Sequence, residues 1–87
     1  MSEAGKLQFP TEFPIKVMGR HGTDLRRLSR LIVEKHAGPL HDDQIRDRAS
    51  AASNFLSLTY VIQATSQAQL DAIYRELTAC EAVLMAL

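Results

Sequence analysis

The chain has 87 residues, of which 46% are hydrophobic and 23% charged, with ten basic and ten acidic side chains. This length is enough for one domain, and the composition is that of a folded chain rather than one disordered throughout. The lack of a basic excess argues against a dedicated nucleic-acid-binding protein, because such proteins gain most of their affinity from cations that neutralise phosphates.

Cysteine content and the N-terminal residues indicate the compartment. Cys80 is the single cysteine, so an intrachain disulfide and a multi-thiolate metal site are both excluded. The opening MSEAGKLQ lacks the apolar core of a signal peptide, and no apolar run approaches the ~20 residues of a membrane-spanning helix. We therefore expect a cytoplasmic protein.

The N-terminal part predicts a flexible lead-in over residues 1–8, followed by a single domain over residues 9–87. The alternation in FPIKVM predicts a strand over Phe13–Met18 that ends at the following glycines. Its parity places Phe13, Ile15 and Val17 on one face and Lys16 and Met18 on the other.

A helix is predicted next, starting at Thr23 or Asp24, which are both suitable N-cap residues. Its apolar residues at helical spacing are Leu25, Leu28, Leu31 and Ile32. The sequence HAGP, with Gly38 and Pro39, ends the helix. The charged segment around Ile45 then predicts an exposed edge strand, and ASAASN predicts a hairpin loop.

The second half of the domain repeats the pattern of strand and helix. Phe55–Ala64 is rich in β-branched and aromatic residues, which predicts a strand. One face holds Leu56, Leu58, Tyr60 and Ile62, and the other holds Phe55, Ser57, Thr59, Val61 and Gln63. Ser66 and Gln69 form a predicted capping box that opens a second helix. Its predicted apolar stripe is Leu70, Ile73, Tyr74 and Leu77.

The final segment AVLMAL predicts a short strand, with Val83, Met85 and Leu87 on one side and Leu84 on the other. The element order is therefore β-α-β-β-α-β. With right-handed crossovers, this order predicts an α+β, ferredoxin-like sandwich, in which two helices cover one face of a four-stranded antiparallel sheet.

The chain resembles the YbeD-like family of small bacterial proteins of unknown function. The resemblance rests on FPTEFPIKVMG, on HAG and on SNFLSLTYVIQATS, and it extends over residues 9–87. Its most distinctive residues are Phe9, Pro10, Phe13, Lys16, Val17, Met18 and Gly19. The resemblance implies a ferredoxin-like fold similar to the ACT regulatory domains, and it implies no established activity and no catalytic residues.

The corner MGRHGTD joins the first strand to the first helix and is a candidate ligand site. In ACT-like folds an effector lies against the amides of this loop. Glycines permit close approach of a ligand to the backbone, an arginine can bind an anion through two hydrogen bonds, and the helix dipole favours negative charge. The candidate residues for a small anionic effector are Gly19, Arg20, His21, Gly22 and Thr23. The alternative is that both glycines serve turn geometry alone.

Two further functions share this topology. An acylphosphatase-like hydrolase would use Arg20 to hold phosphate and Asn54 to place water, but the loop pattern of that family is absent. An RNA-recognition motif would need aromatic residues on the uncovered face of the central strands, where only Phe55 is available. We keep a weak RNA-binding domain as the alternative function and the hydrolase as the third.

A metal site or a cofactor is not predicted. The three histidines, His21, His36 and His41, lack the spacing of helical ligands, and no cysteine pair accompanies them. Cys80 has no base beside it and is interpreted as a packed residue at a helix end.

The uncovered face of the sheet carries the functional hypothesis. Its predicted interaction residues are Lys16, Met18, Phe55, Val61 and Leu84. Contiguous exposed apolar side chains commonly mark a protein–protein contact. We therefore predict a non-enzymatic, ACT-like regulatory or adaptor module that pairs through this face, either with itself as a homodimer or with a partner protein.

Overall fold

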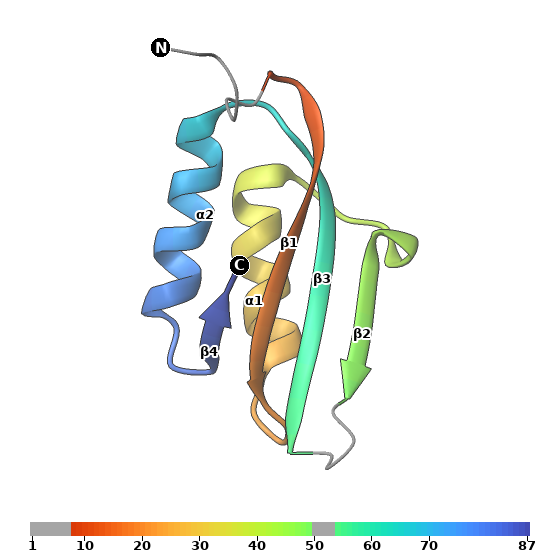
Figure 1. The fold of residues 1–87 in the computed structure, drawn as a ribbon, viewed down its shortest axis with the longest axis vertical. Helices are drawn as coiled ribbons and strands as arrows, with labels where there is room; N and C mark the ends of the chain where they lie inside the picture. Colours follow the sequence, from red (N-terminus) through yellow and green to blue (C-terminus); the bar gives the residue numbers. More distant parts are fainter. Residues whose placement is uncertain (1–7, 50–53) are drawn as a thin grey trace.

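The computed structural model describes residues 8–49 and 54–87, and it shows the predicted order of elements (Figure 1). The predicted lead-in therefore lies, apart from Gln8, outside the described residues, as does the middle of the predicted hairpin loop. A 3₁₀ turn over Asp42–Gln44, which the sequence did not suggest, precedes the second strand. The elements are β1 (Thr11–Arg20), α1 (Leu25–Ala37), β2 (Ile45–Ala49), β3 (Phe55–Ala64), α2 (Gln67–Ala79) and β4 (Val83–Ala86).

The four strands form one sheet in the order β2-β3-β1-β4, and every neighbouring pair is antiparallel. Both helices pack on one face of this sheet (Figure 1). This arrangement confirms the ferredoxin-like sandwich. It arises because each central strand alternates apolar and polar residues, so that only one face of the sheet needs cover.

The core lies between the sheet and the helices. Ile15 and Val17 from β1 are fully buried, as predicted. The predicted face of β3 is also buried, comprising Leu56, Leu58, Tyr60 and Ile62. From α2, the buried residues are Leu70, Ile73 and Leu77. The parity of the two central strands is therefore confirmed.

Strand β1 is longer than predicted at both ends, because it begins at Thr11 instead of Phe13 and continues through Gly19 to Arg20 instead of ending at Met18. Gly19 is buried inside the strand. At the other end, Pro14 faces the same edge of β1 as Lys16, which exchanges two backbone hydrogen bonds with Leu87. Within the described residues no strand pairs with that edge at Pro14, so its missing N–H leaves no gap in a ladder.

The predicted parity of β4 is wrong for Met85 and Leu87. The register between β1 and β4 shifts between Met18 and Gly19, so that Met85 pairs with Met18 but Val83 pairs with Gly19. One extra residue on β4 at this bulge reverses the alternation beyond it. Val83 and Ala86 therefore pack against the core, whereas Leu84, Met85 and Leu87 are exposed.

The buried face of α1 also differs from the predicted one. Its buried residues are Leu25, Ser29 and Val33, and Leu31 is 54% exposed. Ser29 is accommodated because its hydroxyl donates to the Leu25 carbonyl at 2.6 Å and shares a 2.5 Å hydrogen bond with the Tyr60 hydroxyl. A polar residue with both partners in place costs little to bury.

The capping box of α2 is confirmed in one of its two bonds. The backbone N–H of Gln69 donates to the Ser66 hydroxyl at 3.0 Å. The Gln69 side-chain oxygen accepts from the N–H of Thr65 rather than from that of Ser66. The side-chain nitrogen of Gln69, Nε2, also donates to the His36 carbonyl, so a hydrogen bond connects the start of α2 to the end of α1.

Two carboxylates stabilise the end of α1 through hydrogen bonds. Glu34 accepts hydrogen bonds from the backbone N–H of Leu40 at 2.8 Å and from Arg30 Nε at 3.1 Å, and these lower the pKa of Glu34. Glu76 on α2 lies 2.6 Å from His36 Nε2 and 3.2 Å from Lys35 Nζ. The bonds from His36 and then Lys35 lower the pKa of Glu76.

Acid is expected to weaken the fold through these two groups. Because both folded-state pKa values lie below the ordinary 4.5, their stabilisation is present above that pH and is lost as the pH falls through the folded-state values. Urea unfolding at a series of pH values should show the loss, and Glu34→Gln with Glu76→Gln should make it shallower. Glu81→Gln is the matched control, and an equal effect from it would contradict this explanation.

Candidate functional site

The sheet face that no helix covers, here called the open face, is the candidate site. It receives side chains from all four strands. By strand register its residues are Glu12, Pro14, Lys16, Met18, Arg20, Arg46, Arg48, Phe55, Ser57, Thr59, Val61, Gln63, Met85 and Leu87. Leu84, the extra residue at the bulge of β4, is exposed beside Met85. The register places four of the five predicted interaction residues on this face, and the fifth, Leu84, is exposed at the bulge. Met85, Leu87, Arg46 and Arg48 were missed.

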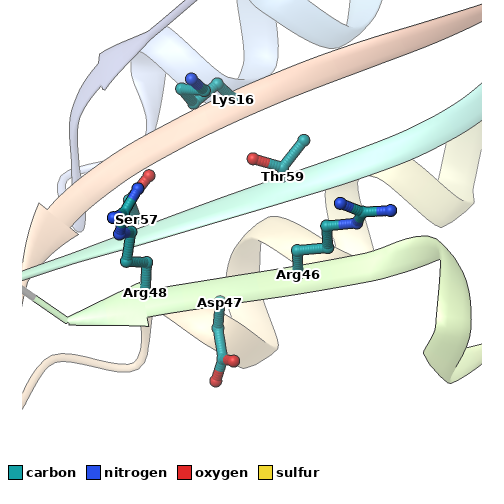
Figure 2. Close-up of a pocket in the computed structure, with 6 residues that line it drawn as sticks. All are labelled: Lys16, Arg46, Asp47, Arg48, Ser57 and Thr59. Atoms are coloured by element: carbon teal, nitrogen blue, oxygen red, sulfur yellow. The ribbon is translucent and has the colours of Figure 1, made fainter.

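A concavity of about 380 Å³ lies over the β2 side of the open face. Its lining residues are three cations, Lys16, Arg46 and Arg48, with Ser57, Thr59 and Asp47. Figure 2 shows the first five of these side chains on the same side of the sheet, whereas Asp47 points to the opposite side. The arrangement follows from strand alternation, because Arg46 and Arg48 flank Asp47 in the sequence of β2.

The strand register sets two rows of side chains across the open face. One row runs Arg48, Ser57, Met18, Met85, and the next runs Arg46, Thr59, Lys16, Leu87. Both rows begin with arginine at the β2 edge and end with an apolar residue at the β4 edge. The open face is therefore basic on one side and apolar on the other, with Lys16 between the two parts.

The cations of α1 are paired, unlike those of the concavity. Arg26 contacts Asp47 at 2.5 Å, Arg27 pairs with Asp24, and Arg30 contacts both Glu34 and Asp42. Lys35 pairs with Glu76. Within residues 8–49 and 54–87, no carboxylate forms an ion pair with Lys16, Arg46 or Arg48. A chain with zero net charge thus presents one distinctly positive surface.

The apolar part of the open face is well exposed. Leu84 is 53%, Met85 49% and Leu87 63% accessible to solvent. Met18 lies beside Met85 in the register and is half-buried. At the far end, Phe55 is 39% exposed and the Arg20 guanidinium lies 5.9 Å from the centre of its ring, a cation–π distance.

At the predicted effector corner, the polar groups bond to one another. The N–H of His21 donates to the Asn54 carbonyl at 2.9 Å, and the Thr23 hydroxyl donates to the Arg20 carbonyl at 2.8 Å. Asp24, the N-cap residue of α1, bonds to Arg27. The Asp24 side chain makes no cap hydrogen bond to the first N–H groups of α1, although its negative charge lies at the end of the helix where the dipole favours an anion.

The two glycines of the corner have different roles. Gly22 has φ of +89°, which favours glycine, and it stands in open space. An added Cβ at Gly19 would lie 2.4 Å from the Ala82 carbonyl oxygen. Gly19 thus lets β1 and the start of β4 approach closely. An anion site at the corner stays a prediction, and the function proposed below does not depend on it.

The structure also shows where the residues considered for hydrolysis, metal binding and thiol chemistry lie. Asn54 immediately precedes β3, and its carbonyl accepts a hydrogen bond from the N–H of His21. The Arg20 guanidinium lies over the ring of Phe55. Among the described residues, no group of three or more His, Cys, Asp or Glu side chains could hold a metal ion. No helix in the described ranges is long and apolar enough to span a membrane. Cys80 is the C-cap residue of α2, as its interpretation as a helix-end residue required.

A family of proteins of unknown function, DUF493, matches residues 4–87 of the chain. The chain belongs to this family. The resemblance to YbeD-like proteins is thereby confirmed for this DUF493 protein, and the match supplies no established activity.

Two bacterial relatives span most of this DUF493 protein. A UPF0250 protein of Ralstonia nicotianae is 40% identical over 73 residues, which is 84% of this chain and 75% of the relative. A UPF0250 protein of Nitrosomonas europaea is 38% identical over 77 residues, or 88% of each chain. Both names denote uncharacterised proteins, so neither relative identifies a substrate or a partner.

One solved structure shares the fold of this DUF493 protein. The solution structure of protein HP0495 from H. pylori superposes with a TM-score of 0.74 over 100% of this chain and 94% of that one. The two sequences are 14% identical. The likeness supports the ferredoxin-like fold alone.

Proposed function

We propose that this protein is a non-enzymatic regulatory or adaptor module that works by binding a protein at its open face. The observation that carries the proposal is the exposure of Leu84, Met85 and Leu87 in one patch, next to cations that lack carboxylate partners among the described residues. Contiguous apolar area with a polar rim is a common property of protein-binding surfaces.

The layered fold supports the same conclusion. A single layer of helices leaves one sheet face uncovered, and such a face is normally more polar than this one. Methionines on this face suit a contact surface, because their unbranched side chains adapt to a partner's shape. Met18 and Met85 lie side by side in the register of β1 and β4.

Photocrosslinking in cells of the source organism tests this proposal. A photoreactive amino acid replaces Thr59 at the centre of the open face, and in a second strain it replaces Ala68, which is exposed on α2. We expect a covalent protein adduct from position 59 and none from position 68. Adding Met85→Glu to the first strain should remove the adduct, because a carboxylate would be buried in the contact.

The opposite results would contradict the proposal. If position 59 yields no protein adduct, or if positions 59 and 68 yield the same adducts, the open face is not the binding surface. A circular dichroism spectrum and melting curve for each purified variant confirm that the fold is retained.

A further inference from the structure

We infer that the partner at the open face is an acidic segment of another protein, in which carboxylates lie next to apolar side chains. This inference rests on the function proposed above and specifies its partner. It is drawn from the charge, the spacing and the division of the open face into a basic and an apolar part.

Charge complementarity is the first argument. Lys16, Arg46 and Arg48 line one concavity, and no carboxylate of the described residues forms an ion pair with any of them. Asp47 also lines it, but its carboxylate points away from the cations and pairs with Arg26 (Figure 2). Elsewhere in the described chain, the cations on α1 have acidic neighbours. Interfaces generally match a positive patch with a negative one, so the partner of this concavity is expected to be acidic.

The spacing of the cations is the second argument. Arg46 and Arg48 are two residues apart on β2, which separates them by about 7 Å along the strand. Carboxylates at alternate positions of an extended segment have this same spacing. Ser57 and Thr59 add hydroxyl groups between the arginines and Lys16, so each carboxylate can accept more than one hydrogen bond.

The apolar part requires apolar groups in the partner. Met85 lies in the same row as Arg48, and Leu87 lies in the same row as Arg46. A partner that covers both parts therefore places apolar side chains about 15 Å from its carboxylates, three strand spacings away. A small anion would fill the concavity and leave the exposed leucines and Met85 uncovered.

A second copy of this chain suits the open face poorly. Two identical faces related by a two-fold axis can align basic part on basic part, which brings like charges together. They can instead align basic part on apolar part, which buries cations without partners. Glu12 on β1 is the one acidic side chain of the described strands on the open face, so neither arrangement neutralises all three of Lys16, Arg46 and Arg48.

Nucleic acid also suits the open face less well than an acidic protein. Single-stranded RNA binds such sheets by stacking bases on aromatic side chains of the central strands. On the described open face Phe55 is the aromatic residue, and it lies at the end of β3 with Arg20 over its ring. The central positions hold Lys16, Met18, Ser57 and Thr59.

Fluorescence anisotropy with designed probes tests the inference. Three short labelled peptides share the same leucines and differ in carrying glutamate, glutamine or lysine at the remaining positions. We expect the glutamate peptide to bind at least tenfold more tightly than the other two, and less tightly as salt rises. Arg46→Glu with Arg48→Glu should weaken its binding by roughly tenfold or more, because two attractions become repulsions. Arg75→Glu on α2 is the control and should leave binding unchanged.

Several results would overturn the inference. Equal binding of the three peptides would show that charge does not select the partner. A uridine oligonucleotide that binds more tightly than the glutamate peptide would favour RNA, and a dimer in light scattering at the same concentration would favour a second copy. The photocrosslinking experiment separates the two proposals. An adduct at position 59 together with no peptide preference refutes only the acidic partner, whereas no adduct refutes the contact itself.

Discussion

Replacing Gly19 with alanine should destabilise the protein by about 3 kcal/mol or more, at the upper end of what overpacking costs. The added Cβ would lie 2.4 Å from the Ala82 carbonyl oxygen and about 3 Å from both terminal methyl groups of Leu25. The leucine can change rotamer, but the carbonyl belongs to the backbone that leads into β4. Relief therefore requires β4 to move away from β1. Urea unfolding measures the loss of stability.

A double-mutant cycle and a glycine control make this prediction specific. If the methyl groups of Leu25 are part of the clash, Gly19→Ala should cost less in a Leu25→Ala background than in the wild type. It should still cost stability there, because the Ala82 carbonyl remains. Gly22→Ala is the matched control, since φ is +89° but no atom lies within 4 Å of the added Cβ. We expect it to cost about 1 kcal/mol.

Amide exchange localises the effect of Gly19→Ala. The N–H of Leu87 donates to the Lys16 carbonyl at 2.8 Å and reports directly on the pairing of β4. Its exchange should accelerate more than that of the amides of β3. A Gly19→Ala variant as stable as the wild type would show that this glycine is not required for packing.

The parts of the fold that the sequence predicted best are those with the strongest alternation. Strand β3 alternates over ten residues, and its partner β1 is held in register along its whole length. A slip by one residue would expose Tyr60 and Ile62 and bury polar groups, so the burial pattern alone specifies the pairing. Helix α2 was predicted equally well, because its apolar residues keep one helical stripe.

Two errors arose where local pattern and tertiary contact disagree. AVLMAL is apolar throughout, so alternation cannot reveal an extra residue at the bulge between β1 and β4. In α1, Leu31 was expected to face the core, but Ser29 and Val33 do so. A serine looks like a surface residue in the sequence, and only its bond to Tyr60, 31 positions away, makes it a core residue.

The sequence predicted the apolar residues of the candidate site but not its arginines. Met18, Phe55 and Val61 follow from strand parity and lie on the open face, and Leu84 is exposed at the bulge of β4. The arginines at 46 and 48 alternate with Asp47, a signal that was visible in IRDR. Their meaning depends on the register with β3, because only pairing with Ser57 and Thr59 brings them near Lys16. Segregation of charge onto one face cannot be read from a net charge of zero.

The second large effect is expected at Tyr60, the largest fully buried side chain of the described residues. It lies at the centre of β3, and its hydroxyl reaches Ser29 on α1. Burial raises the pKa of Tyr60 above its ordinary 10.0, so the side chain stays neutral at physiological pH. Tyr60→Ala should cost about 3–5 kcal/mol, because it opens a cavity between the sheet and α1.

Tyr60→Phe separates the hydrogen bond from the packing. The ring is kept, and Ser29 still donates to the Leu25 carbonyl at 2.6 Å, so no buried polar group loses every partner. We therefore expect a cost of about 1 kcal/mol, several times smaller than that of alanine. Thermal and urea unfolding of both variants, with Ser29→Ala and the Ser29→Ala/Tyr60→Phe double mutant, give the coupling between the two hydroxyls. If Tyr60→Phe and Tyr60→Ala lower the free energy of unfolding equally, the hydroxyl rather than the ring holds α1 on the sheet.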